Sequence, residues 1–263
     1  MAKRPATRRV RAEQTDHDHQ DARSERGVVR AMFSGRNGGQ WSPIANEDGQ
    51  EGERDQRFLK TVKPRSAGQE VLCAAIDRSP LVVALGPAGT GKTYLAIAKA
   101  VEALEAGKVG RIVLSRPAVE AGESIGFLPG DMEEKLAPYL RPLTDALSDR
   151  MNPKRLKQMM LEGLIEIAPI GFMRGRTLNN AFVVIDEAQN CTYGQLKMLL
   201  TRLGWHSTMI VTGDPAQSDL LPELSGLGTI AEKLESLSDV AVVRLKDSDI
   251  VRHPLVASML GVL

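Results

Sequence analysis

The stretch Gly86-Pro-Ala-Gly-Thr-Gly-Lys-Thr93 decides the fold of this chain of 263 residues. It follows a short apolar run, Leu81-Val-Val-Ala-Leu85, and precedes a segment whose apolar residues have helical spacing. Two glycines separated by four residues and followed by Lys and Thr, between a strand and a helix, form the P-loop pattern. The glycines let the backbone curl so that its N–H groups point at a polyphosphate, and the helix adds its N-terminal dipole. The sequence therefore predicts a nucleoside triphosphate site.

Particular residues of the loop have distinct predicted roles. Lys92 supplies a positive charge for the β- and γ-phosphates, and the Thr93 hydroxyl is a candidate ligand of Mg²⁺. The predicted nucleotide-binding residues are the loop and its immediate flank: Gly86, Pro87, Ala88, Gly89, Thr90, Gly91, Lys92, Thr93 and Tyr94.

A second nucleotide motif is Ala181-Phe-Val-Val-Ile-Asp-Glu-Ala188. Its apolar run is typical of a strand buried in a parallel sheet, and acidic residues follow where that strand ends. Ligands bind at this carboxyl edge in α/β sheets. Asp186 fits a residue that holds Mg²⁺, and Glu187 beside it fits a general base that activates the attacking water.

Polar residues also follow the apolar run Ser207-Thr-Met-Ile-Val-Thr212, in the segment Gly213-Asp-Pro-Ala-Gln217. Gln217 is a candidate to touch the γ-phosphate or its water and so to sense hydrolysis. The alternative is an ordinary Gly-Asp-Pro turn.

Gln69 lies at the start of a helical pattern just upstream of the P-loop strand. A side-chain amide carries a donor and an acceptor, so Gln69 is able to pair with an adenine edge. A surface glutamine near a helix start is the competing interpretation.

The remaining periodicities predict strands at 111–115, 164–168 and 240–245 and helices at 132–150 and 153–161. Thr192 and Gln195 form a capping box that opens a further helix. Cys191, which precedes this helix, is expected to be a packed small residue. Ser225 is expected to cap a helix that turns Leu227, Ile230, Leu234 and Leu237 inward. The expected fold class is α/β, with a mostly parallel sheet of five to six strands and helices on both faces.

Composition excludes several classes of protein. The chain is 42% hydrophobic and 25% charged, with a formal net charge of +1, which is typical of a globular domain. It has no apolar run of about 18 residues and no secretory signal, so no membrane partner is expected. Cys73 and Cys191 lack metal-binding spacing, which favours a reduced, cytoplasmic protein. Residues 1–55 are charged and poor in aliphatic residues, so we expect a disordered N-terminal arm.

In this order, the segments GPAGTGKT, SRPAVEAGESIGFLPGD, MRGRTLNNAFVVIDEAQN, LTRLG, GDPAQSDL and SGLG resemble the PhoH family of P-loop ATPases. The resemblance runs from about Lys63 to the end, so 56–263 is interpreted as a PhoH-like P-loop ATPase domain. It implies a RecA-like fold similar to the first such domain of superfamily-one helicases, with ATP and Mg²⁺ as ligands. It also implies that Gln69 reads adenine, that Arg116 and its loop contact a nucleic-acid strand, and that Gln217 senses phosphate. Family members are cytoplasmic, are thought to form hexameric rings and are linked to RNA metabolism.

A site of this type needs a further cation at the γ-phosphate, usually from a second RecA-like unit. About 200 folded residues make one such unit, so we expect another protomer of a ring to complete the site. The candidates for this arginine finger are Arg252, Arg174 and Arg176, in no fixed order. For Arg252, a structural ion pair is an equal alternative.

Three functions remain open at this stage. The leading hypothesis is an ATPase that couples hydrolysis to the remodelling or unwinding of RNA or single-stranded DNA. A P-loop kinase is the first alternative, although Glu187 opposes it because activating water would waste the phosphoryl group. The second alternative is a non-enzymatic adaptor gated by nucleotide.

Overall fold

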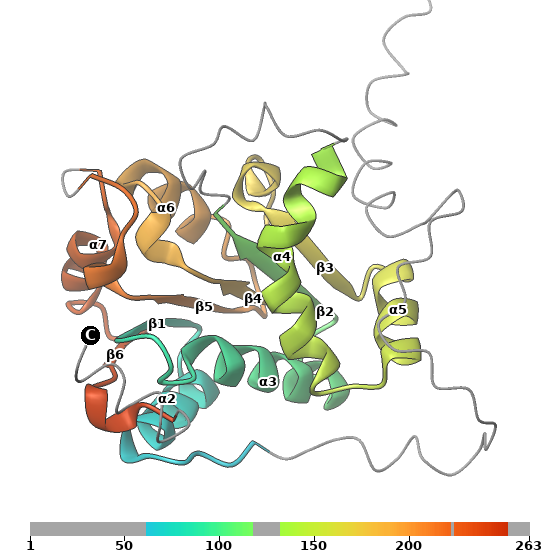
Figure 1. Cartoon of the computed structure of the whole chain (residues 1–263), viewed down its shortest axis with the longest axis horizontal. Helices are drawn as coiled ribbons and strands as arrows, with labels where there is room; N and C mark the ends of the chain where they lie inside the picture. Colours follow the sequence, from blue (N-terminus) through green and yellow to red (C-terminus); the bar gives the residue numbers. More distant parts are fainter. Residues whose placement is uncertain (1–61, 118–131, 222–223, 252–263) are drawn as a thin grey trace, which may run out of the picture. The chain divides into compact units, whose positions relative to one another are not determined.

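Six short apolar runs form one parallel sheet in the computed structural model, which describes residues 62–117, 132–221 and 224–251. The strands lie in the order β3-β2-β4-β5-β1-β6, and all neighbouring pairs run parallel (Figure 1). The predicted α/β class is thereby confirmed, with a sheet that is wholly parallel. The predicted arm, residues 1–55, and Arg252 lie outside the described residues. The strands are β1 Leu81–Leu85, β2 Arg111–Arg116, β3 Ile165–Pro169, β4 Ala181–Ile185, β5 Thr208–Gly213 and β6 Val240–Arg244.

The strand order places β5 between the strand of the P-loop and the strand of the acidic motif. Leu85 at the end of β1 pairs with Gly213 of β5, and Ile185 at the end of β4 pairs with Val211. Because the strands are parallel, their carboxyl ends meet at one edge of the sheet. The three polar segments predicted from the sequence therefore converge at that edge.

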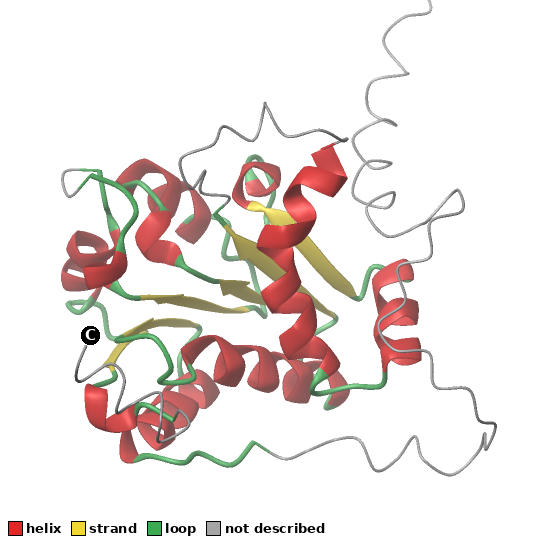
Figure 2. Ribbon diagram, viewed as in Figure 1, coloured by secondary structure: helices red, strands yellow, loops and turns green. Residues whose placement is uncertain are grey.

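Helices cover both faces of the sheet (Figure 2). On one face lie α2 (Ala67–Arg78), α3 (Lys92–Glu105) and α4 (Met132–Ser148), and α5 (Pro153–Leu161) packs against β3 and α4. On the other face lie α6 (Tyr193–Leu200) and α7 (Leu227–Leu234). Within the described ranges, no helix combines the length and apolar character needed to cross a membrane.

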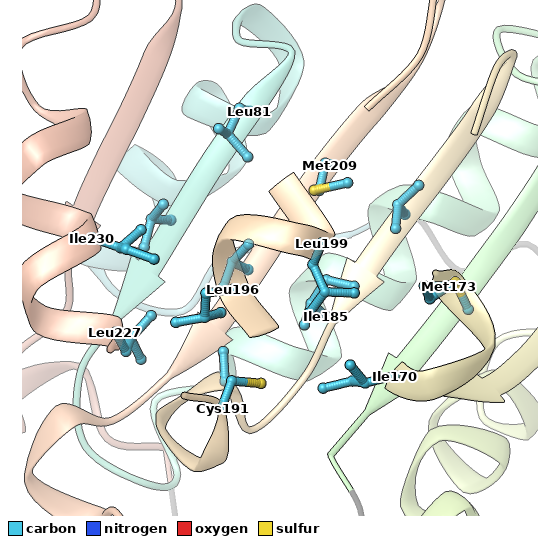
Figure 3. Packing of buried hydrophobic residues seen from close by; sticks show 14 of the residues in the cluster. Leu81, Ile170, Met173, Ile185, Cys191, Leu196, Leu199, Met209, Leu227 and Ile230 are labelled. Carbon is cyan, nitrogen blue, oxygen red and sulfur yellow. The ribbon is translucent and has the colours of Figure 1, made fainter. Parts of the chain in front are cut away.

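The core on the α6 and α7 side is continuous and apolar (Figure 3). Leu196 and Leu199 of α6 and Ile230 of α7 point at the sheet. They belong to one buried cluster with Ile185 and Met209 of the sheet. Each such side chain contributes roughly 1.5–3 kcal/mol by leaving water. Cys191 is fully buried in this cluster, and burial raises the pKa of its thiol to about 12, so the expectation of a packed, inert cysteine is confirmed.

The two helix starts on this face differ in how well the sequence predicts them. The capping box of α6 is confirmed, since Thr192 Oγ1 accepts from Gln195 N and Gln195 Oε1 accepts from Thr192 N. The prediction that Ser225 caps α7 is wrong, because the N-cap is Gly226 and the Ser225 hydroxyl donates to Gln189 O. A Cβ at Gly226 would lie 2.4 Å from Tyr193 Cα, so close packing of the two helix starts requires glycine there. Leu237, expected to face inward, follows α7 and is 51% exposed.

Candidate functional site

The P-loop runs from β1 to α3 through three glycines in conformations that other residues rarely adopt. Gly86, Gly89 and Gly91 have φ of 144°, 86° and 83°. A Cβ at Gly86 would also lie 2.6 Å from Leu245 O, which fixes glycine at that position on steric grounds. Gly91 is the N-cap of α3, and it offers no side chain to the N–H groups of the first turn. The helix start therefore presents its positive end to an anion.

Lys92, the first residue of α3, is a buried cation held over this loop. Its Nζ donates to Gly86 O at 2.5 Å and to Pro87 O at 2.9 Å. Burial lowers the pKa of Lys92, and the charges of Asp214, Glu187 and Asp186 oppose this shift only in part. A polyphosphate beside Nζ would offset the cost of burying the charge.

Asp186 follows β4 and is 3% exposed. Its Oδ1 accepts hydrogen bonds from Thr93 Oγ1 at 2.5 Å and from Thr212 Oγ1 at 2.7 Å. The first bond joins the P-loop helix to the acidic motif, and the second ties the same oxygen to β5. Thr212 was not singled out from the sequence; a hydroxyl near the carboxyl end of a buried strand was the available signal.

These oxygens fit Mg²⁺. The Thr93 hydroxyl and the Asp186 carboxylate are hard ligands, and Mg²⁺ is usually held by one or two carboxylates together with substrate phosphates and water. Across the described ranges, no group of three or more His, Cys, Asp and Glu side chains forms a cage that would hold a metal alone. The donor set therefore suits a cation that arrives with a phosphate ligand.

Glu187 is fixed by its backbone and by one buried amide. Its φ is 51°, a left-handed conformation that is uncommon for a residue with a side chain. Its Oε2 accepts from Gln189 Nε2 at 2.5 Å, and Gln189 Oε1 accepts from Asp214 N at 3.1 Å. Gln189 is 3% exposed, so the carboxylate is tied through it to the end of β5. Strain of this kind is typical of functional sites.

A cavity of about 660 Å³ lies over these groups. The predicted residues that line it are Gln69, Ala88, Gly89, Gly91, Lys92, Thr93, Tyr94, Asp186, Glu187 and Gln217. Three predicted residues of the loop are outside the lining: Gly86, Pro87 and Thr90. The segments that meet at the sheet edge thus surround one space large enough for a nucleotide.

Gln69 has a structural role that the sequence did not predict. Its Oε1 accepts from Arg65 N at 2.8 Å, and its Nε2 donates to Thr90 O at 2.9 Å. The side chain therefore braces the P-loop from the start of α2 while it lines the cavity. One amide proton and one lone-pair direction remain for a ligand, and adenine reading stays a prediction.

Gln217 ends a short 3-10 turn, η5 (Pro215–Gln217), and is exposed at the cavity. Asp214 opens this turn by accepting from Ala216 N at 3.0 Å. The Gly-Asp-Pro turn and the cavity position are therefore both present, and phosphate sensing stays a prediction.

Arg150 lines the cavity although the sequence did not single it out. It is 3% exposed, its Nη1 donates to Tyr94 OH at 3.3 Å, and its guanidinium lies 5.7 Å from the Tyr94 ring centroid. Tyr94 itself is 41% exposed. A buried arginine therefore orients the aromatic ring that flanks the P-loop.

Three arginines were named as finger candidates. Arg176 holds Glu166 through two short contacts of 2.5 and 2.7 Å, so it serves a local ion pair. Arg174 is exposed. Arg252 lies outside the described residues.

A family model described as PhoH-like protein matches residues 61–263. The PhoH-like protein of Bacillus subtilis (strain 168) is 52% identical over 202 residues, which cover 76% of this chain and 63% of the relative. The PhoH-like protein of Mycobacterium tuberculosis (strain ATCC 25618 / H37Rv) is 53% identical over 201 residues, or 76% and 57% of the two chains. Protein PhoH of Escherichia coli (strain K12) is 44% identical over 205 residues, or 77% and 58%. The chain thus spans less than two thirds of the length of each of these relatives.

Two solved structures are more distantly similar. The large terminase of a thermophilic bacteriophage has a TM-score of 0.49 and 12% identity, covering 76% of this chain and 50% of the other. The Sulfolobus solfataricus SWI2/SNF2 ATPase core in complex with dsDNA has a TM-score of 0.46 and 14% identity, covering 78% and 53%. Similarity this low supports no conclusion about function. The P-loop, the converging acidic motif and the match over residues 61–263 together establish that this chain belongs to the PhoH family.

Proposed function

We propose that this protein hydrolyses ATP with the help of Mg²⁺. The observation that carries the proposal is the meeting of Lys92, Thr93, Asp186 and Glu187 around one cavity at the carboxyl edge of the sheet. A binding module needs the lysine and the helix start. A carboxylate beside the metal-ligand position adds the group that hydrolysis requires.

Each residue then has a defined task. The loop N–H groups and Lys92 hold the phosphates, while Thr93 and Asp186 would hold Mg²⁺, which neutralises charge on the transferred phosphoryl group. Glu187 accepts a proton from the water that attacks the γ-phosphorus. Gln217, which lines the cavity from its turn, would touch that water or the departing phosphate.

Hydrolysis is favoured over phosphoryl transfer to a small acceptor. Glu187 has a left-handed backbone conformation and its Oε2 is anchored by Gln189, so its carboxylate is held at the cavity although the side chain is 38% exposed. A general base held beside the γ-phosphate would promote transfer of the phosphoryl group to water. A kinase must avoid this reaction, because it has to transfer the group to its acceptor.

We further propose that hydrolysis is coupled to single-stranded nucleic acid, most simply RNA. Arg116 lies at the same sheet edge and contacts both carboxylates. Aromatic residues make up only 4% of the chain, so binding would rest mainly on phosphate contacts and would weaken steeply with salt.

A cytoplasmic hexameric ring is the assembly that we propose. Among the described residues, four basic side chains line the cavity: Lys63, Arg65, Lys92 and Arg150. Of these, Lys92 belongs to the P-loop, and Arg150 contacts Tyr94. A finger from a neighbouring protomer would supply further charge at the γ-phosphate. In a ring each protomer offers this group to the next.

Phosphate release by the purified protein tests the proposal. It is measured without acceptor and with RNA, single-stranded DNA or duplex DNA, at two salt concentrations. We expect release that depends on Mg²⁺ and rises with a single strand at low salt. No release without an acceptor would revive the kinase, and release that no nucleic acid changes would remove the coupling.

A further inference from the structure

Arg116 contacts both carboxylates of the acidic motif. It is the last residue of β2, and its side chain is 24% exposed. Its Nη1 lies 3.8 Å from Asp186 Oδ2, and its Nη2 lies 3.6 Å from Glu187 Oε1. The candidate base therefore has a guanidinium at one oxygen and the Gln189 amide at the other.

The two contacts at Glu187 differ in strength. The Gln189 bond is 2.5 Å long and comes from a buried side chain, whereas the Arg116 contact exceeds the 2.7–2.9 Å of a charge-assisted hydrogen bond. Arg176 shows what a structural pair looks like in this chain, with contacts to Glu166 of 2.5 and 2.7 Å. Oε2 is thus an anchor, and Oε1 is held by an exchangeable partner.

Arg116 reaches the carboxylates from the β2 side. Asp186 and Glu187 line the nucleotide cavity, but Arg116 is not part of that lining. An anion outside the cavity could therefore engage the guanidinium without displacing the nucleotide. A phosphodiester suits this position, because its oxygens match the planar fork of an arginine.

We propose that Arg116 is a positioning residue that restrains the Glu187 carboxylate until a phosphodiester of single-stranded nucleic acid draws its guanidinium away. The inference rests on the proposed nucleic-acid-coupled ATPase. A general base must bring an oxygen within about 2.6–3.2 Å of the water proton. While Oε1 faces Arg116 and Oε2 faces Gln189, neither oxygen is turned fully to the attacking water. When Arg116 moves away, Oε1 becomes free to accept the proton, and the bond from Gln189 keeps Glu187 in place.

The backbone allows this exchange without disturbing the metal ligand. Asp186 N donates to Ser115 O at 2.8 Å, and Asp186 Oδ1 keeps its bonds from Thr93 and Thr212. Asp186 would lose only the 3.8 Å contact of its Oδ2 with Arg116 when that side chain moves. The expected signature is slow hydrolysis in the free protein and acceleration by single strands.

Arg116→Gln tests the inference in the full chain, with Arg155→Gln as the matched control. Arg155 forms an ion pair of 2.7 Å with Glu105 and lies outside the cavity lining. Phosphate release is measured with and without poly-uridylate, and ATP affinity is measured by titration. We expect Arg116→Gln to raise the basal rate about two- to fivefold, the scale of a partly exposed ion pair, and to lose the stimulation. ATP affinity should be unchanged, and Arg155→Gln should behave as wild type.

A second comparison shows that the effect passes through the base. Arg116→Gln combined with Glu187→Gln should be as slow as Glu187→Gln alone. If Arg116→Gln does not fold, Arg116→Lys replaces it; the retained charge should keep the basal rate low, and the lost fork should weaken stimulation.

The outcomes separate the inference from the proposed function. An unchanged or lower basal rate in Arg116→Gln, or retained stimulation, overturns the inference while wild-type hydrolysis still supports the function. A wild type that hydrolyses ATP but ignores poly-uridylate overturns the role of the phosphodiester. A wild type that releases no phosphate overturns both.

Discussion

Thr93 and Asp186 are 93 positions apart in the sequence, yet Thr93 Oγ1 donates a hydrogen bond of 2.5 Å to Asp186 Oδ1. Thr93 lies in the first turn of the P-loop helix, and Asp186 follows the strand of the acidic motif. β5 separates the two strands, so the bond spans the carboxyl edge of the sheet. This contact joins the two halves of the candidate site.

Lys92→Ala should lose nucleotide affinity and keep its fold. Removing a charged donor to the phosphates should weaken ATP binding by roughly 10- to 100-fold, as hydrogen bonds to charged groups predict. The variant loses the bonds from Nζ to Gly86 O and Pro87 O, but it also removes a charge whose pKa is lowered by burial. Because these two effects oppose each other, we expect only a small change in stability. Titration with ATP and thermal melting check this, with exposed Lys108→Ala as the control. A variant that does not fold would contradict this role.

Thr212→Val should weaken the response to Mg²⁺. Thr212 is fully buried and donates to Asp186 Oδ1, so the variant keeps the shape and loses one positioning bond. A net hydrogen bond of about 1 kcal/mol corresponds to about a fivefold increase in the Mg²⁺ concentration for half-maximal hydrolysis. An unchanged Mg²⁺ titration would show that Thr212 does not position the carboxylate.

Arg150→Met should weaken binding of the nucleotide and spare binding of inorganic tripolyphosphate. Met retains much of the packing but loses the bond to Tyr94 OH and the charge near its ring. If the Tyr94 ring packs against the adenine of ATP, the affinity for ATP should fall about three- to tenfold, the range of one such contact. Binding of tripolyphosphate, measured by competition, is the control. If the affinities for ATP and tripolyphosphate fall equally, Arg150 acts on the phosphates or on folding and not through Tyr94.

Asp249→Asn should destabilise the fold in a pH-dependent way. Hydrogen bonds from Lys246 N, the Ser66 side chain and Gly68 N lower the pKa of Asp249, with Lys246 the largest cause. A carboxylate with a lowered folded-state pKa adds stability above its unfolded pKa, near 3.9, and loses it as pH falls further. The variant should therefore cost about 1–3 kcal/mol at pH 7 in urea unfolding, and the difference should narrow below about pH 4. A difference that is constant across pH would contradict this origin.

Much of the sheet edge could be predicted because its signals are local. A short apolar run followed by polar residues identifies both a buried strand and its carboxyl end, which is why Asp186, Glu187 and Gln217 were found. The glycine spacing located the phosphate loop for the same reason. Parallel pairing then brought these segments around one cavity.

The residues that were missed depend on packing between distant segments. Arg150 reaches Tyr94, 56 positions away, only because its segment follows a helix that packs on α3. Gln69 braces Thr90 through a contact over 21 positions. Gly226 replaces Ser225 as a cap because α6 approaches closely. No spacing in the sequence encodes these distances, so they required the folded chain.

Glu187→Gln is the most direct test of the proposal that this site hydrolyses ATP. The amide keeps the size of the side chain but cannot accept the proton from water. Phosphate release in a single turnover, measured together with ATP affinity, separates chemistry from binding. We expect binding to be retained and release to fall by about 100-fold or more, the contribution of a positioned base. Equal rates of release in the variant and the wild type would contradict the role of Glu187.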